Sequence, residues 1–122
     1  LLVGVGGQGT ILVSKILSTG LMTAGYDVKM SEIHGMAQRG GSVSTQVRYG
    51  SEVFSPIIGI GEADILVSFE TMETLRWLEY LKPDGVVVIN DFEIASAPIL
   101  MGKADYPEGI IELIEEKANQ GY

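Results

Sequence analysis

The stretch LLVGVGGQGTILVSKIL, residues 1–17, joins a short apolar run to a glycine-rich turn and then to residues with helical spacing. The run Leu1–Val5 is continuous and ends in glycines, which predicts a buried β-strand. From Gln8 to about Ala24 apolar residues recur three and four positions apart, which predicts a helix that ends near Gly25. A strand that passes through glycines into a helix is typical of the first unit of an α/β sheet.

The same alternation of strand and helix continues along the chain. It predicts strands at Val28–Ser31, Ser42–Arg48, Ala63–Ser68, Val86–Ile89 and Pro98–Met101, and helices at Glu70–Leu81 and Glu108–Lys117. Such alternation predicts an α/β fold, a three-layer α/β/α arrangement around a mostly parallel, Rossmann-like sheet. We interpret residues 1–122 as a single domain. Because a further strand would be expected after the last helix, we also expect this domain to be incomplete at its C-terminal end.

The composition excludes several kinds of site and partner. The sequence has no cysteine and a single histidine, so these residues offer neither a disulfide nor thiolate ligands for zinc or an iron–sulfur cluster. The net charge is −8: residues 1–50 hold four basic and two acidic residues (+2), and residues 51–122 hold four and fourteen (−10). An acidic chain without a basic stripe predicts no nucleic-acid partner. No apolar run approaches the roughly 20 residues of a membrane helix, and the lack of cysteine fits a reducing cytoplasm, where we expect the protein.

The glycine-rich turn has the pattern G-x-G-x-x-G, between a predicted strand and a predicted helix. In that context Gly6, Gly7, Gln8 and Gly9 are candidates to face a ligand, because glycines leave the backbone N–H groups of a helix N-terminus free to meet an anion. Three interpretations stay open: close packing of strand and helix without a ligand, a phosphate-bearing ligand, or NAD. For NAD, Glu32 lies 23 positions after Gly9 and would hold the ribose.

A second stretch, EIHGMAQRGGSV at residues 32–43, gathers polar residues between two predicted strands. Gly40 and Gly41 permit a tight turn with exposed N–H groups, and Arg39 carries a planar fork of donors suited to phosphate or carboxylate. Gln38 donates and accepts hydrogen bonds, and His34, the only histidine, titrates near neutrality and is the candidate for proton transfer. We interpret this stretch as an anion-facing loop. A structural salt bridge for Arg39 and a packing role for His34 are the competing interpretations.

Four segments together resemble one enzyme family. They are GVGGQGTILVSKIL (4–17), SEIHGMAQRGGSVSTQVRYG (31–50), ETMETLRWLEYLKPDGVVVIND (70–91) and PILMGKADYP (98–107). They resemble the gamma subunit or domain of 2-oxoacid:ferredoxin oxidoreductases, with the closest likeness to the small beta subunit of indolepyruvate ferredoxin oxidoreductases. The resemblance covers essentially the whole chain, and its two N-terminal segments are the specific part.

The resemblance implies a subunit of an enzyme that oxidatively decarboxylates a 2-oxoacid, such as indolepyruvate or another aryl pyruvate, to an acyl-CoA. It implies that thiamine diphosphate, magnesium and [4Fe-4S] clusters lie on a partner subunit, with none bound by this chain alone. Coenzyme A is then the co-substrate and ferredoxin the electron acceptor, and the loop around Arg39 would face a site shared with the partner. Two alternatives remain: an NAD(P)-binding Rossmann-type oxidoreductase and a non-catalytic protein-interaction module.

Overall fold

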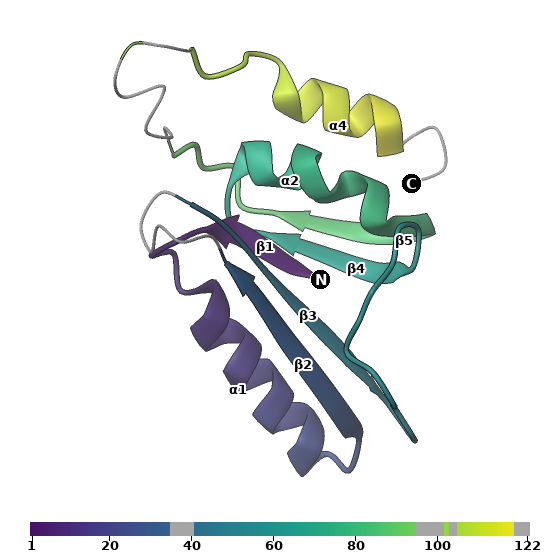
Figure 1. Ribbon diagram of the computed structural model, residues 1–122. Helices are drawn as coiled ribbons and strands as arrows, with labels where there is room; N and C mark the ends of the chain where they lie inside the picture. Colours follow the sequence, from purple (N-terminus) through teal and green to yellow (C-terminus); the bar gives the residue numbers. More distant parts are fainter. Residues whose placement is uncertain (35–40, 95–101, 103–104, 119–122) are drawn as a thin grey trace.

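The computed structural model describes residues 1–34, 41–94, 102 and 105–118 as one five-stranded sheet with helices on its faces (Figure 1). The strand order is β2-β3-β1-β4-β5. The strands are β1 (Leu2–Val5), β2 (Asp27–His34), β3 (Ser42–Gly50), β4 (Ala63–Ser68) and β5 (Leu81–Ile89). The helices are α1 (Thr10–Thr23), α2 (Thr71–Trp77), which continues into the short 3-10 turn η1 (Leu78–Tyr80), and α4 (Ile110–Ala118).

The α/β fold predicted from the sequence is confirmed, but the sheet is mixed. β4 pairs in parallel with both β1 and β5, whereas β3 is antiparallel to both β1 and β2. The antiparallel pairing of β2 with β3 follows from the length of their connection, which is only seven residues, 35–41. A parallel pair needs a crossover of a dozen or more residues, so these two strands pair as a hairpin. The strand predicted at Pro98–Met101 lies outside the described residues.

The two faces of the sheet carry different helices. Helix α1 contacts β1, β2 and β3 on one face, and α2 contacts β1, β4 and β5 on the other, with α4 packed on α2 (Figure 1). The apolar core lies beneath α2 and η1, where Val3, Leu66 and Leu81 are almost fully buried. Burying a side chain of this size stabilises the fold by about 1.5–3 kcal/mol.

Helix α1 packs on the sheet through small polar side chains. Its buried residues are Thr10, Ser14 and Ser18, spaced four apart on one side. Small side chains on this side let the helix backbone approach the strands closely. The apolar residues that predicted this helix therefore include several that are solvent-exposed, among them Leu12 and Ile16. No helix in the described part of the chain is both long and apolar enough to cross a membrane.

Candidate functional site

The candidate site lies at the edge of the sheet where the parallel strands β1, β4 and β5 end. After β1 the chain enters α1 on one face, and after β4 it enters α2 on the other (Figure 1). Where neighbouring parallel strands send their helices to opposite faces, a crevice opens at their carboxyl ends, and ligands of open α/β sheets bind there. Here the glycine loop Gly6–Gly9 and the residues Phe69–Thr71 border that position.

The glycine loop needs glycine for two different reasons. Gly7 and Gly9 have φ angles of 96° and 86°, in the left-handed region that other residues adopt at a cost. Gly4, at the end of β1, has an ordinary backbone, but a Cβ there would come within 2.8 Å of Thr10 Oγ1 and 3.2 Å of Phe69 Cβ. Close packing therefore explains Gly4. Gly9 is the N-cap of α1, and no side chain caps the helix there. The backbone N–H groups of the first turn therefore need backbone acceptors or a ligand as partners.

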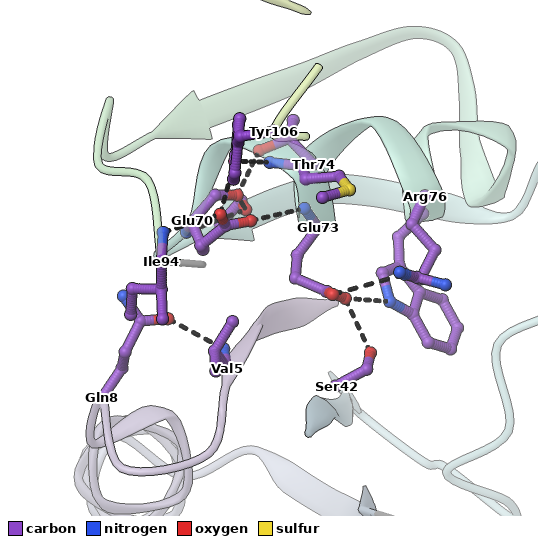
Figure 2. A network of polar contacts seen from close by, with 12 residues as sticks. Val5, Gln8, Ser42, Glu70, Glu73, Thr74, Arg76, Ile94 and Tyr106 are labelled. Atoms are coloured by element: carbon purple, nitrogen blue, oxygen red, sulfur yellow. Dashed lines mark hydrogen bonds and ion pairs between the residues drawn. The ribbon is translucent and has the colours of Figure 1, made fainter. Parts of the chain in front are cut away.

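Gln8 ties the glycine loop to β4. Its Oε1 accepts a hydrogen bond from the Val5 amide at 2.8 Å (Figure 2). Its Nε2 donates to the Phe69 carbonyl at 2.7 Å. Both ends of the side-chain amide are thus engaged with backbone. Gln8 lies in the glycine-rich turn, and its two hydrogen bonds connect the end of β1 with the residue that follows β4.

The second predicted stretch meets the glycine loop at this same edge. The Gly6 amide donates to the Gly41 carbonyl at 2.8 Å, and Val5 pairs with Ser42 in the sheet. His34 ends β2, where its backbone pairs with Val43. The two separate sequence motifs are therefore joined by a direct hydrogen bond. Gln38, Arg39 and Gly40, together with the side chain of His34, lie outside the described part of the chain.

A buried carboxylate fixes the first residue of β3 beneath this edge. Glu73 in α2 accepts hydrogen bonds from Ser42 Oγ at 2.6 Å and from Trp77 Nε1 at 3.3 Å, and it pairs with Arg76 Nε at 3.3 Å (Figure 2). Several donors around one carboxylate offset the cost of removing it from water. Since Ser42 directly follows Gly41, this contact anchors the end of the predicted anion-facing loop to α2.

A second carboxylate, Glu70, holds the chain after β5 against the same edge. Its side chain is 1% exposed and accepts hydrogen bonds from the Glu73 amide at 2.9 Å, the Ile94 amide at 3.1 Å and the Tyr106 hydroxyl (Figure 2). Tyr106 also accepts from the Met72 amide at 3.0 Å. Burial, and then the hydrogen bond to Glu70, raise the pKa of the Tyr106 phenol, so it stays a protonated donor.

Comparison with known proteins shows which family the chain belongs to. Residues 1–120 match the pyruvate ferredoxin/flavodoxin oxidoreductase family. The chain belongs to that family. It is 42% identical over 118 residues to an indolepyruvate oxidoreductase subunit IorB of Pyrococcus horikoshii, covering 95% of this chain and 58% of that protein. It is 44% identical over 117 residues to the subunit of the same name from Methanothermobacter thermautotrophicus, covering 94% and 59%.

A solved structure has a similar fold. It is the gamma subunit of a keto/oxoacid ferredoxin oxidoreductase from Geobacter sulfurreducens, with a TM-score of 0.57 and 23% identity over 90% of this chain and 67% of that one. The resemblance predicted from the sequence is confirmed. The chain spans a little under three fifths of the length of the curated relatives it matches.

The strand order of the sheet disfavours the NAD interpretation of the glycine loop. In a dinucleotide site the strand that carries the ribose-binding carboxylate lies next to β1. Here β3 lies between them, since Glu32 pairs with Thr45 and Thr45 pairs with Leu2. Two strand spacings, about 10 Å, separate Glu32 from β1. The acidic residue predicted for NAD is thus one strand too far away.

Sequence reasoning missed the two carboxylates and the tyrosine that hold this edge together. Glu70 lies two residues after the end of β4 and precedes Glu73 by three positions, which resembles the spacing of a capping box at a helix start. That signal was available in the sequence. Tyr106 carries no local signal, because its bond to Glu70 spans 36 positions.

Proposed function

We propose that this chain is part of the small, cluster-free component of a 2-oxoacid:ferredoxin oxidoreductase. The reaction is oxidative decarboxylation, in which the oxoacid loses CO2, its acyl group is transferred to the thiol of coenzyme A, and the electrons reduce ferredoxin. Indolepyruvate or another aryl pyruvate is the proposed oxoacid, because the curated relatives carry that substrate in their names. The observation that carries the proposal is the Gly6–Gly41 hydrogen bond, which joins the glycine loop to the second polar stretch at one sheet edge, within the residues that match the family.

The iron–sulfur clusters of such an enzyme belong, in this proposal, to a partner subunit. The 122 residues contain no cysteine, so they supply no thiolate to a cluster. The described residues also contain no group of three or more histidine, aspartate or glutamate side chains placed to hold a metal. Thiamine diphosphate with its magnesium, also assigned to the partner, would stabilise the carbanion left by decarboxylation. The compartment we propose is the reducing cytoplasm, which suits thiolate-ligated clusters.

The role of this chain is to present the residues around Arg39 to an anion at the shared site. Both the oxoacid and coenzyme A are anionic. The buried charged groups beneath this edge, Glu70 and Glu73, are acidic, and Arg76 beside them is already paired with Glu73. A cation is therefore needed, and Arg39 is the only arginine or lysine in the range 30–47. Its two flanks are fixed, by β2 at His34 and by the Gly41 contact, so the loop begins and ends at the same edge of the sheet as the glycine loop. Arg39 supplies the bidentate donors, Gly40 and Gly41 the backbone donors, and His34 a group for proton transfer.

The test is reconstitution of activity from separately purified components. The full-length protein and its large partner subunit are mixed and assayed for oxoacid- and CoA-dependent reduction of ferredoxin. We expect activity only with both proteins present, and no iron in the small component by metal analysis. Oxoacid oxidation by the small component alone, or NAD(H) binding at micromolar Kd (about −8 kcal/mol), would contradict the proposal.

A further inference from the structure

Helix α1 turns its largest apolar side chains away from the protein. Leu12 and Ile16 are 63% and 64% exposed, while Thr10, Ser14 and Ser18 on the opposite side are buried against the sheet. Figure 1 shows α1 on the outside of the molecule, and no other described element lies over its outer side. A surface helix of a monomeric protein has the reverse arrangement, with its apolar stripe facing the core.

The outer side of α1 also lies in the part of the chain with the least charge. Residues 1–26 contain no acidic residue, although the chain has sixteen, and they contain one basic residue, Lys15. Depletion of charge distinguishes the buried centre of a protein interface from the rest of a protein surface. Residues 1–26 therefore lack the acidic side chains whose net charge opposes association of protein surfaces.

The apolar surface continues from α1 onto the uncovered side of β4 and β5. Leu17 of α1 lines a cavity of about 570 Å³ together with Ile65 and Val67 of β4, and the charged residues Arg48, Glu62 and Asp64 also line this cavity. Val86 and Val88 of β5 pair with Ile65 and Val67 in the sheet. The exposed members of this continuous surface, here called the apolar face, are Leu12, Val13, Ile16, Leu17, Ile65, Val86 and Val88.

The size of the apolar face matches one side of a protein interface. From their exposed fractions its seven side chains present on the order of 600 Å² to solvent, against about 800 Å² that each partner contributes to a standard interface. This size is at the upper end of the range of about 300–600 Å² for the largest apolar patch on a monomeric protein, and such patches often have a function.

The most exposed residues of the apolar face decide what covers it. Leu12 and Ile16 lie on the side of α1 opposite its buried residues, so they point away from the sheet. A segment lying beside α1 on β4 and β5 would cover Leu17 and Ile65 but would leave Leu12 and Ile16 in water. A subunit seated over α1 and against β4 and β5 would bury both parts at once.

We propose that the apolar face is the docking surface for the partner subunit of the oxidoreductase. The partner presents an uncharged surface of aliphatic and aromatic side chains, seated over α1 and against β4 and β5. This inference rests on the proposed function, because it takes the partner to be the subunit that carries the clusters. It places the docking surface on α1 and the substrate-facing groups at the glycine loop, where α1 begins.

The absence of cysteine from these 122 residues allows a direct footprint of this surface. Ile16→Cys is introduced into the full-length protein, and the rate of maleimide labelling is measured with and without the purified large subunit. Phe54→Cys is the matched control, because Phe54 is 86% exposed in the loop that follows β3. We expect the large subunit to slow labelling at position 16 at least tenfold and to leave position 54 unchanged.

A binding measurement completes the test. Leu12→Asp combined with Ile16→Asp should raise the Kd for the large subunit by about a hundredfold or more, since it places two charges in the interface centre. Phe54→Asp should leave the Kd within about threefold. Circular dichroism confirms that both variants are folded.

The remaining outcomes separate this inference from the proposed function. If the Ile16→Cys protein forms the complex while position 16 is labelled as fast as in the free protein, the docking surface is wrong and the function stands. If no complex or activity forms, both fail. Protection of position 16 in the free full-length protein overturns the inference in favour of intramolecular cover. Protection that depends on protein concentration, without the large subunit, overturns it in favour of a second copy of this chain.

Discussion

Helices α1 and α2 lie on opposite faces of one sheet, and both bury polar side chains, but with different partners. Helix α2 places Glu73 against the sheet edge, and its N-cap is Glu70; both carboxylates are buried and each accepts several hydrogen bonds. Helix α1 places Ser14 and Ser18 against the sheet and leaves Leu12 and Ile16 outside. Polar burial therefore has two purposes in this protein. At α2 it builds a fixed polar network, and at α1 it frees the apolar side chains for another surface.

The network at α2 should lose the most when its central acceptor is removed. Glu70→Ala leaves the amides of Glu73 and Ile94 without their acceptor, so we expect unfolding free energy to fall by about 3 kcal/mol. Denaturant unfolding of the purified full-length protein measures this loss. Glu116→Ala, on the exposed side of α4, is the control and should change stability by less than about 0.5 kcal/mol. Equal effects at both positions would show that the network contributes nothing.

The packing of α1 should respond to size rather than to polarity. Ser14 is fully buried, and its hydroxyl donates only to the Thr10 carbonyl of its own helix, at 2.7 Å. Ser14→Leu therefore pushes α1 away from the strands and should cost about 2 kcal/mol. Ser14→Ala keeps the small volume and should cost less than about 1 kcal/mol. The same unfolding assay compares the two, and a larger loss for Ser14→Ala would contradict close packing as the reason for serine.

Removing the hydrogen bond between Tyr106 and Glu70 should cost less stability than removing the Glu70 side chain. Tyr106→Phe removes one hydroxyl and keeps the ring, so we expect a loss of about 1 kcal/mol. Hydrogen exchange should show faster exchange of the Met72 amide, which donates to the same hydroxyl. Unchanged exchange at Met72 would place the tyrosine outside the network.

The pH dependence of that link follows from the raised pKa of the Tyr106 phenol. Folding favours the protonated phenol, so its contribution is complete below the ordinary tyrosine pKa of 10.0 and is lost as pH rises above it. The difference in unfolding free energy between the wild type and Tyr106→Phe should therefore narrow from about pH 9 to about pH 11. Urea unfolding at these pH values measures it, and a difference that widens would have the wrong sign.

Local sequence patterns predicted the elements well because each depends on neighbours in the chain. The strand–glycine–helix pattern of residues 1–17 and the apolar run at Val86–Ile89 are of this kind. The antiparallel insertion of β3 depends instead on the length of one loop, which was visible in the sequence but was not used. The Ser42–Glu73 contact spans 31 positions, and no local rule pairs them. The outward apolar side of α1 was equally hidden, because helical spacing shows a stripe without showing which side the sheet covers.

In the arrangement proposed above, one end of α1 serves catalysis while its outer side serves assembly. The most direct measurement titrates the large subunit with wild-type protein, with Arg39→Ala, and with Leu12→Asp combined with Ile16→Asp, and records initial rates of oxoacid-dependent ferredoxin reduction. For Arg39→Ala we predict a normal midpoint and a KM for coenzyme A or oxoacid raised about ten- to a hundredfold. For the α1 variant we predict a midpoint shifted about a hundredfold, with wild-type KM values at saturation. A shifted midpoint for Arg39→Ala with unchanged KM values, or altered KM values with a normal midpoint for the α1 variant, would contradict the account.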